Sequence, residues 1–256
     1  MKKRGWLYAV FGLVFYLLFL IIEMPASWFA WGLNQYSHGA VRLAPLGGSL
    51  WSGNGRLVIY YPQTVPHDIG QTEWSINLFW LLSGRVQLTL QNNMPDRQIK
   101  TTLGIAKGSF SIKDTDAAFP AIFVGQLYPP AILIGPQGQV RLRTSGLVFS
   151  QQNLEGSATL EWLSAASSLS SVQPLGDYRL DITGAGKTAN LKLTTQRGDL
   201  ELTGQGQWQL ANGQIQFTGM ANSQKREKEL ESLMQLLGKD MGSGRRSFSL
   251  SHRLPF

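Results

Sequence analysis

The chain contains no cysteine. This absence excludes a disulfide scaffold, a thiol-dependent enzyme and a zinc site with cysteine ligands. Charged residues are also scarce, at 15% of the 256 residues, compared with about 25% in an average soluble protein. The hydrophobic content of 43% nevertheless excludes a disordered chain. The length suits one or two domains with a sizeable core.

Groups that carry enzyme chemistry are sparse and scattered. The three histidines, His38, His67 and His252, are far apart in the sequence and lack neighbours at metal-ligand spacing. Asp114 and Asp116 lie close together, but we interpret them as solvated loop carboxylates. No set of residues matches the roles that an active site requires. The sequence therefore predicts no catalytic, cofactor-binding or metal-ligating residue, and a protein that is not an enzyme and has no cofactor.

The N-terminal segment combines a basic cluster with an apolar run. The cluster is Lys2, Lys3 and Arg4. After it, Gly5–Ile22 is a stretch of eighteen residues without charge or proline. As a helix this stretch rises about 27 Å, close to the hydrocarbon thickness of a bilayer. Trp28 and Trp31 follow at the position of an aromatic belt, so the pattern predicts a transmembrane segment.

Two interpretations of this segment compete. A cleaved signal peptide has the same charge order, but its apolar core is usually about 7–15 residues long. We favour an uncleaved signal-anchor that spans residues 5–24. The apolar run is longer than the core of a signal peptide, and Met24-Pro25-Ala26 is a poor cleavage site. The positive-inside rule places the tip, residues 1–4, in the cytoplasm. We therefore expect a single-pass protein of the cell inner membrane, with the bulk of the chain in the periplasm.

The positive net charge is not the footprint of a nucleic-acid-binding protein. Without Glu23 and the N-terminal cluster, 20 basic and 15 acidic residues remain, and the basic ones are scattered through the chain. Nucleic-acid binding favours clustered basic residues. We expect no nucleic-acid partner, and weak attraction to anionic lipid headgroups is the more natural use of this charge.

Beyond about residue 40 the dominant pattern is the alternation of apolar and polar residues that is typical of strands with one buried face. Residues 85–90 and 178–182 show it clearly. The connections are short and rich in glycine, as in Arg197-Gly198-Asp199 and Ala211-Asn212-Gly213. Parallel strands would need helical crossovers, and none is visible before residue 222. The sequence predicts a mainly β fold, with an antiparallel, strongly curved sheet forming a half-pipe or a rolled sheet.

The strand pattern is interrupted once by an apolar segment that carries several prolines. It contains Pro120, Pro129, Pro130 and Pro136, which exclude a continuous membrane helix. We favour a buried crossing between two halves of the sheet, and the alternative is an apolar contact surface for a partner or a lipid. The expected parts are a juxtamembrane segment 25–39 and a periplasmic β domain 40–221, with halves at about 40–118 and 138–220 joined by the crossing 119–137.

Residues 222–238 predict an amphipathic helix, which the tail 239–256 follows. Leu230, Leu233, Met234 and Leu237 recur at helical spacing and form one apolar stripe. The helix is expected to cover the open end of the sheet, and the alternative is docking to a partner. Its charged side makes Arg226 and Glu227 candidate partner contacts. In the tail, Phe248 and Leu250 could add a last strand.

Four tryptophans are candidates for the core. They are Trp51, Trp74, Trp80 and Trp162. We favour buried positions for them, because large aromatic side chains dominate protein cores. The alternative is that they form surface contacts with a partner.

The order of these features is similar to that of a known family. The basic tip and anchor lead into Gly48-Ser49-Leu50-Trp51-Ser52-Gly53-Asn54-Gly55, followed by Glu73-Trp74 and by Trp80-Leu81-Leu82-Ser83-Gly84. Phe119-Pro120 and Leu175-Gly176-Asp177-Tyr178 come later. The chain resembles the type II secretion system protein N family from residue 1 to about residue 240. The family has no catalytic residues to carry over.

Two functions follow from these observations. The resemblance implies an accessory or assembly component of the type II secretion system, which presents a periplasmic β domain to other machine subunits for the export of folded proteins across the outer membrane. Its partners are then secretion subunits in the inner membrane and periplasm, and the lipid bilayer. The alternative is a membrane-anchored β-groove protein with an AsmA-like architecture that binds lipid or another hydrophobic ligand. A sheet with one apolar face and few helices motivates it, because something must cover that face.

Overall fold

The computed structural model describes residues 3–60, 66–94, 97–122, 124, 133–223 and 227–253. It divides into two compact units, unit 1 (Met1–Asp96) and unit 2 (Arg97–Phe256). The sequence suggested a division at the proline-rich segment instead, because the strand alternation stops there.

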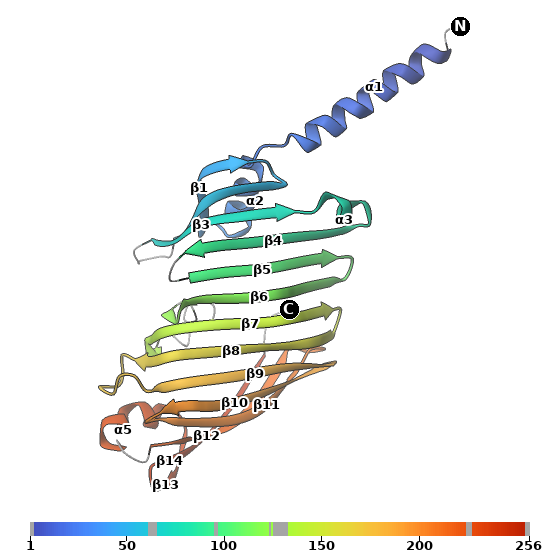
Figure 1. Ribbon diagram of the computed structural model, residues 1–256. Coiled ribbons are helices and arrows are strands. Elements are labelled where there is room, and N and C mark those ends of the chain that lie inside the picture. Colours follow the sequence, from blue (N-terminus) through green and yellow to red (C-terminus); the bar gives the residue numbers. More distant parts are fainter. Residues whose placement is uncertain are drawn as a thin grey trace. The chain divides into compact units, whose positions relative to one another are not determined.

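In its described residues, unit 1 contains three helices and four strands. Figure 1 shows the helices and the strands of this unit in blue to green. The helices are α1 (Lys3–Ile22), α2 (Ser27–Tyr36) and α3 (Leu78–Leu82). The strands are β1 (Val41–Gly48), β2 (Ser52–Ile59), β3 (His67–Ile76) and β4 (Arg85–Met94). They pair antiparallel in chain order. Because antiparallel strands alternate in direction, the β1–β2 and β3–β4 connections lie at the same end of this sheet.

The core of unit 1 lies between the sheet and α2. Leu43 and Trp74 are buried on the sheet, and Ala26 is buried at the start of α2. The Phe29 ring of α2 stacks on the Trp74 ring at a centroid distance of 4.5 Å. Helix α2 therefore covers one face of the first four strands.

Unit 2 is a longer antiparallel sheet with one described helix. Its strands are β5 (Arg97–Ala106), β6 (Ser109–Pro120), β7 (Pro136–Ser150), β8 (Asn153–Ser167), β9 (Gly176–Gly186), β10 (Thr188–Gly198), β11 (Glu201–Gln209), β12 (Gln214–Asn222), β13 (Lys239–Gly242) and β14 (Arg245–Arg253). The helix is α5 (Glu227–Leu236). The strand order follows the chain from β5 to β12 and ends β12-β14-β13. In the described part of the chain the first and last strands do not pair, so the sheet is open.

The predicted fold class is confirmed in its main feature. All strand pairings in the described ranges of both units are antiparallel, and helices are few. The physical reason is the one read from the sequence, since turns such as the two residues between β7 and β8 leave no length for a parallel crossover in most connections.

The sheet of unit 2 bends strongly across its middle. Phe149 of β7 and Trp208 of β11 lie with ring centroids 6.3 Å apart. Three strands separate β7 from β11, and on a flat sheet the two strands would be about 19 Å apart. The rings therefore meet only because the sheet curls around the face that carries them, which we call the inner face. Figure 1 shows β11 to β14 turned steeply relative to β6 and β7.

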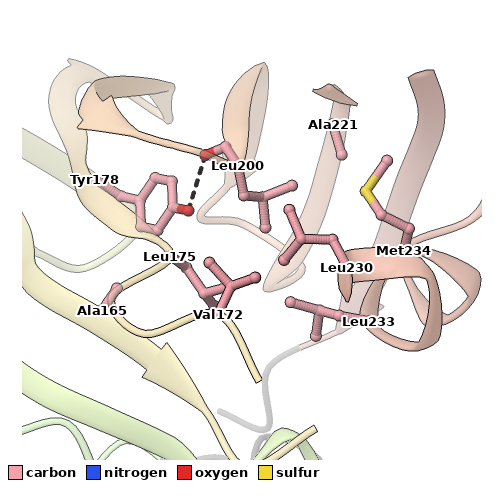
Figure 2. Close-up of a cluster of buried hydrophobic side chains, with 9 residues drawn as sticks. All are labelled: Ala165, Val172, Leu175, Tyr178, Leu200, Ala221, Leu230, Leu233 and Met234. Carbon is pink, nitrogen blue, oxygen red and sulfur yellow. Dashed lines mark hydrogen bonds between the residues drawn. The ribbon is translucent and has the colours of Figure 1, made fainter. Parts of the chain in front are cut away.

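The helix α5 fills one end of the inner face of unit 2. Its Leu230, Leu233 and Met234 are buried against side chains from β8 to β12 and the β8–β9 connection (Figure 2). In the same cluster the Tyr178 hydroxyl donates a hydrogen bond to the Leu200 carbonyl oxygen at 2.9 Å. The apolar stripe of 222–238 thus covers the sheet, as expected from its spacing, although the described helix is shorter than that range.

The proline-rich segment contributes strand residues at both of its ends, and the tail forms the last strand that Phe248 and Leu250 suggested. β6 runs to Pro120 and β7 begins at Pro136, and the two strands pair up to Pro120 and Gln139. The segment therefore joins the ends of two neighbouring strands. In the tail, β14 contains Phe248 and Leu250 and pairs with β12 along nine residues.

The N-terminal helix α1 covers the apolar run of the sequence. Its side chains from Val10 to Ile22 are exposed in the isolated chain. Taken over the residues that the structure describes, no helix has both the length and the apolarity needed to cross a membrane. The transmembrane anchor remains a prediction.

Candidate functional site

Within the described ranges, the structure contains no group of three or more His, Asp or Glu side chains placed to hold a metal ion. The segments that carry the family resemblance instead meet at one end of unit 1. They come from the β1–β2 connection, the end of β3 and helix α3. We define this end, residues 21–25, 48–53 and 74–85, as the junction.

Trp51 is the residue that joins these segments. Its indole Nε1 donates to the Ile21 carbonyl oxygen at 2.7 Å, at the end of α1. Its own carbonyl oxygen accepts from the backbone N–H of Ile76 at 2.6 Å, at the end of β3. Leu50 N donates to Met24 O at 2.7 Å in the same region. The carbonyl groups at a helix end have no partner within the helix, so Trp51 satisfies one and fixes the end of α1 to the sheet.

Trp74 forms the buried floor of the junction. Its side chain is 2% exposed, and its Nε1 donates to the Leu50 carbonyl oxygen at 3.1 Å. A Cβ atom at Gly53 would lie 2.5 Å from the Trp74 ring. Any other residue at Gly53 would displace this ring, which explains the glycine in the Leu-Trp-Ser-Gly segment.

Helix α3 presents apolar side chains to solvent at the junction. Phe79 is 83% exposed, Leu82 is 89% exposed and Trp80 is 41% exposed. Asn77 caps the helix by accepting from Phe79 N at 3.0 Å. The Arg85 guanidinium lies over the Trp80 ring, 5.7 Å from its centroid.

The tryptophans do not share one environment. Trp74 is buried as predicted, and Trp51 and Trp162 are half-buried with their indole N–H groups bonded. The prediction of a core position is wrong for Trp80. Trp80 lies on a five-residue helix that no other element covers in the described residues. An apolar local sequence therefore does not mean that the side chains are buried.

The outer face of unit 2 carries a row of ion pairs that sequence analysis missed. Asp116 of β6 accepts from Arg141 Nε of β7 at 2.6 Å, so its interpretation as a solvated loop carboxylate is wrong. The hydrogen bond from Arg141 holds the pKa of the Asp116 carboxyl below its usual value, outweighing partial desolvation. The row continues to Arg143 and Glu161, 3.5 Å apart. Only the strand register reveals such cross-strand pairs, because the partners lie 25 residues apart in the sequence.

The predicted site residues lie in separate places. Lys2 and Arg226 lie outside the described residues, as do the side chains of Lys3, Arg4 and Glu227. Trp28 and Trp31 are on α2, 55% and 63% exposed, with their rings 6.4 Å apart in an edge arrangement. Within the described residues, the structure thus gathers the motifs that contain Trp51, Trp74 and Trp80.

A comparison with known protein families gives a match over most of the chain. The family described as type II secretion system (T2SS), protein N, matches residues 39–249, which include most of the junction and both β units. No curated protein and no solved structure matches the chain. The match covers more than half of the sequence, and the chain therefore belongs to the type II secretion system protein N family.

Proposed function

We propose that this component of the type II secretion system is a non-enzymatic accessory or assembly part of the inner membrane. In this proposal α1 anchors the chain, the N-terminus is cytoplasmic, and both β units lie in the periplasm. There the units contact other secretion subunits during the export of folded proteins. Family membership supports the assignment of the chain to the type II secretion system.

The uncharged run supports the anchor. Gly5–Ile22 has the length of a bilayer-spanning helix and follows the basic cluster. The apolar side chains of α1 that are described, such as Phe11, Phe15 and Phe19, are exposed, so they have no protein core of their own. Contact with lipid acyl chains would remove these side chains from water.

The junction is the observation that carries the proposal. Because Trp51 bonds to both the end of α1 and the end of β3, one end of the sheet of unit 1 is held against the end of α1. A flexible tether would let the β units move freely. A bonded junction instead holds unit 1 beside the membrane surface, which suits a part that positions subunits.

Co-purification tests the proposed role. A tagged chain extracted from membranes in mild detergent is expected to enrich other secretion subunits, and a strain that lacks the chain is expected to export less cargo. No enrichment together with unchanged export would contradict the proposal. Unchanged export alone would not, because accessory parts can be redundant.

The charged start of α5 offers a finer test of partner contact. Reversal of Arg226 or Glu227 is expected to weaken the co-purification without loss of folding. Reversal of Glu231, which is exposed on the same helix, is the matched control. Equal effects at all three positions would argue against a specific contact at 226 and 227.

The lipid-binding alternative is favoured by one observation. Ile105 and Phe110 face each other on β5 and β6, on the inner face next to Phe149, and are 55% and 37% exposed. Leu250 of β14 shares the inner face and is 46% exposed. An apolar face of this kind could hold a hydrophobic chain. Mass spectrometry of the gently extracted protein would detect a bound lipid, and its absence would weigh against this function.

A further inference from the structure

We propose that helix α3 is a second membrane contact, which inserts Phe79, Trp80 and Leu82 into the lipid headgroup region beside the end of α1. This inference rests on the proposed anchoring of α1 in the inner membrane. It adds an interfacial element that fixes the orientation of unit 1 on the bilayer.

The first argument is composition. All five residues of α3 are apolar, and the three most exposed ones are aromatic or aliphatic. Exposed apolar residues are common singly, but a cluster of large ones on a short loop marks a contact surface. Tryptophan with a neighbouring arginine suits the interface, where the ring contacts acyl chains and the guanidinium reaches phosphate groups.

The second argument is position. Ile21 at the end of α1 and Ile76 at the end of β3 bond to the same residue, Trp51. Helix α3 starts two residues after Ile76, at Leu78. The loop between β1 and β2 is held at the same place, because Leu50 bonds to Met24. The exposed side chains of α3 are therefore at the end of unit 1 where the anchor leaves the bilayer.

The third argument is that insertion requires no refolding. The cap at Asn77 and the Ser83 hydroxyl, which donates to the Trp80 carbonyl oxygen at 2.7 Å, already close the helix at both ends. Leu78 and Leu81 are half-buried against the unit, which leaves the other apolar side chains free. Burial of these side chains in lipid would leave the core of unit 1 intact.

The absence of cysteine allows a direct test with the full-length protein. Single cysteines at Phe79→Cys and Leu82→Cys are labelled with an environment-sensitive fluorophore, and the protein is reconstituted into vesicles of phosphatidylethanolamine and phosphatidylglycerol. We expect a blue-shifted emission, quenching by nitroxide lipids and loss of quenching by aqueous iodide. The matched control is Tyr36→Cys, because Tyr36 is an aromatic residue that is 90% exposed in the same unit. It lies by the start of β1, roughly 20 Å along the strand from the junction, and its label is expected to stay in water.

A fourth label at Phe15→Cys, in the middle of α1, separates the two proposals. Lipid quenching at residue 15 with water-exposed labels at 79 and 82 would overturn the contact of α3 and leave the anchor standing; the apolar helix would then point to a protein partner. Lipid quenching at 79 and 82 without quenching at 15 would support the α3 contact and overturn the anchor. Labels at 79 and 82 that match the label at 36 overturn the inference in every case.

A second variant keeps the test independent of the label. Phe79→Ser combined with Leu82→Ser removes the apolar surface at two positions that bury little area in the protein, so the fold is expected to persist. A label at Ser83→Cys is expected to be quenched by nitroxide lipids in the otherwise unchanged protein. In the double variant this quenching is expected to be lost. Retained quenching at residue 83 would contradict a role for these side chains.

Discussion

Trp74 and Trp80 show how differently two neighbouring tryptophans are used in unit 1. Trp74 is buried under Phe29 and bonds to Leu50, whereas Trp80 stands on an exposed helix beside Arg85. At the residue scale, the side chains around each ring therefore decide whether it contributes stability or a contact surface. The same distinction separates Tyr178, which is buried and bonded, from the exposed Tyr36.

Replacement of each of the two tryptophans by alanine is expected to lower the free energy of unfolding by a different amount. Trp74→Ala is expected to lower the free energy of unfolding by about 3–5 kcal/mol, because it leaves a cavity and an unpaired Leu50 carbonyl group. Trp80→Ala is expected to change it by about 1 kcal/mol or less, since the side chain is largely exposed. Chemical denaturation of both variants measures the difference. Equal losses would show that the two rings are equally buried.

Asp116 predicts a pH dependence of stability. Arg141 lowers the pKa of its carboxyl in the folded state, so the unfolded state binds the proton more tightly. The contribution of the Asp116–Arg141 pair to the free energy of unfolding is therefore present above the ordinary aspartate pKa of about 4. It is lost as the pH falls through the lower folded value. Because both side chains are more than a third exposed, the pair is worth about 0.2–1 kcal/mol. Asp116→Asn is expected to remove this difference between pH 7 and pH 3 in denaturation curves, and an unchanged pH profile would contradict the assignment.

Helices of this protein gain their roles from the sheets on which they lie. α2 covers the sheet of unit 1 and α5 fills one end of the inner face of unit 2, whereas α3 is too short to cover a sheet. At the scale of elements, the stripe of Leu230, Leu233 and Met234 is useful only because the sheet curls around it. A flat sheet would leave much of the stripe exposed.

The packing of α5 predicts a matched pair of leucine variants. Leu233→Ala is expected to cost about 2–5 kcal/mol of unfolding free energy, since the side chain is 5% exposed in the core cluster. Leu236→Ala is the control, because Leu236 lies on the same helix and is 65% exposed. Thermal or denaturant unfolding compares them. A similar loss in both variants would argue that α5 does not pack as described.

At the scale of the whole molecule, an apolar N-terminal run precedes the antiparallel strands. The family match includes nearly all of these strands and starts after the run, at residue 39. The strands can therefore be recognised as belonging to the family without the run. The proposed localisation depends on the run itself.

Charges in the run test the anchor at this scale. Leu13→Arg combined with Leu17→Arg is expected to abolish carbonate-resistant membrane association, because each arginine costs about 2.5–3.5 kcal/mol at the centre of a membrane helix. Tyr36→Arg, outside the run, is expected to leave the association unchanged. Mass measurement of the N-terminus in the parent protein distinguishes an uncleaved anchor from a cleaved signal peptide. Continued membrane retention of the double variant would contradict the anchor.

Local patterns were sufficient to predict several parts of the protein. Alternation in 85–90 and 178–182 predicted strands, glycine-rich turns predicted antiparallel pairing, and the spacing of Leu230, Leu233 and Met234 predicted α5. Each of these features depends on residues within a few positions of one another. Backbone hydrogen bonding and side-chain periodicity act at that range, so the sequence by itself determined them.

Tertiary structure alone decided the features that join distant residues. Trp51 links Ile21 to Ile76, Asp116 pairs with Arg141, and Phe149 meets Trp208 across three intervening strands. These contacts depend on strand register and on the bending of the sheet, both of which sum small effects over many residues. For the same reason, burial of Trp74 and exposure of Trp80 could not be read from the residues that flank each of them in the sequence. The tryptophan motifs were visible in the sequence, but only the folded sheet of unit 1 brings them together at the end of α1.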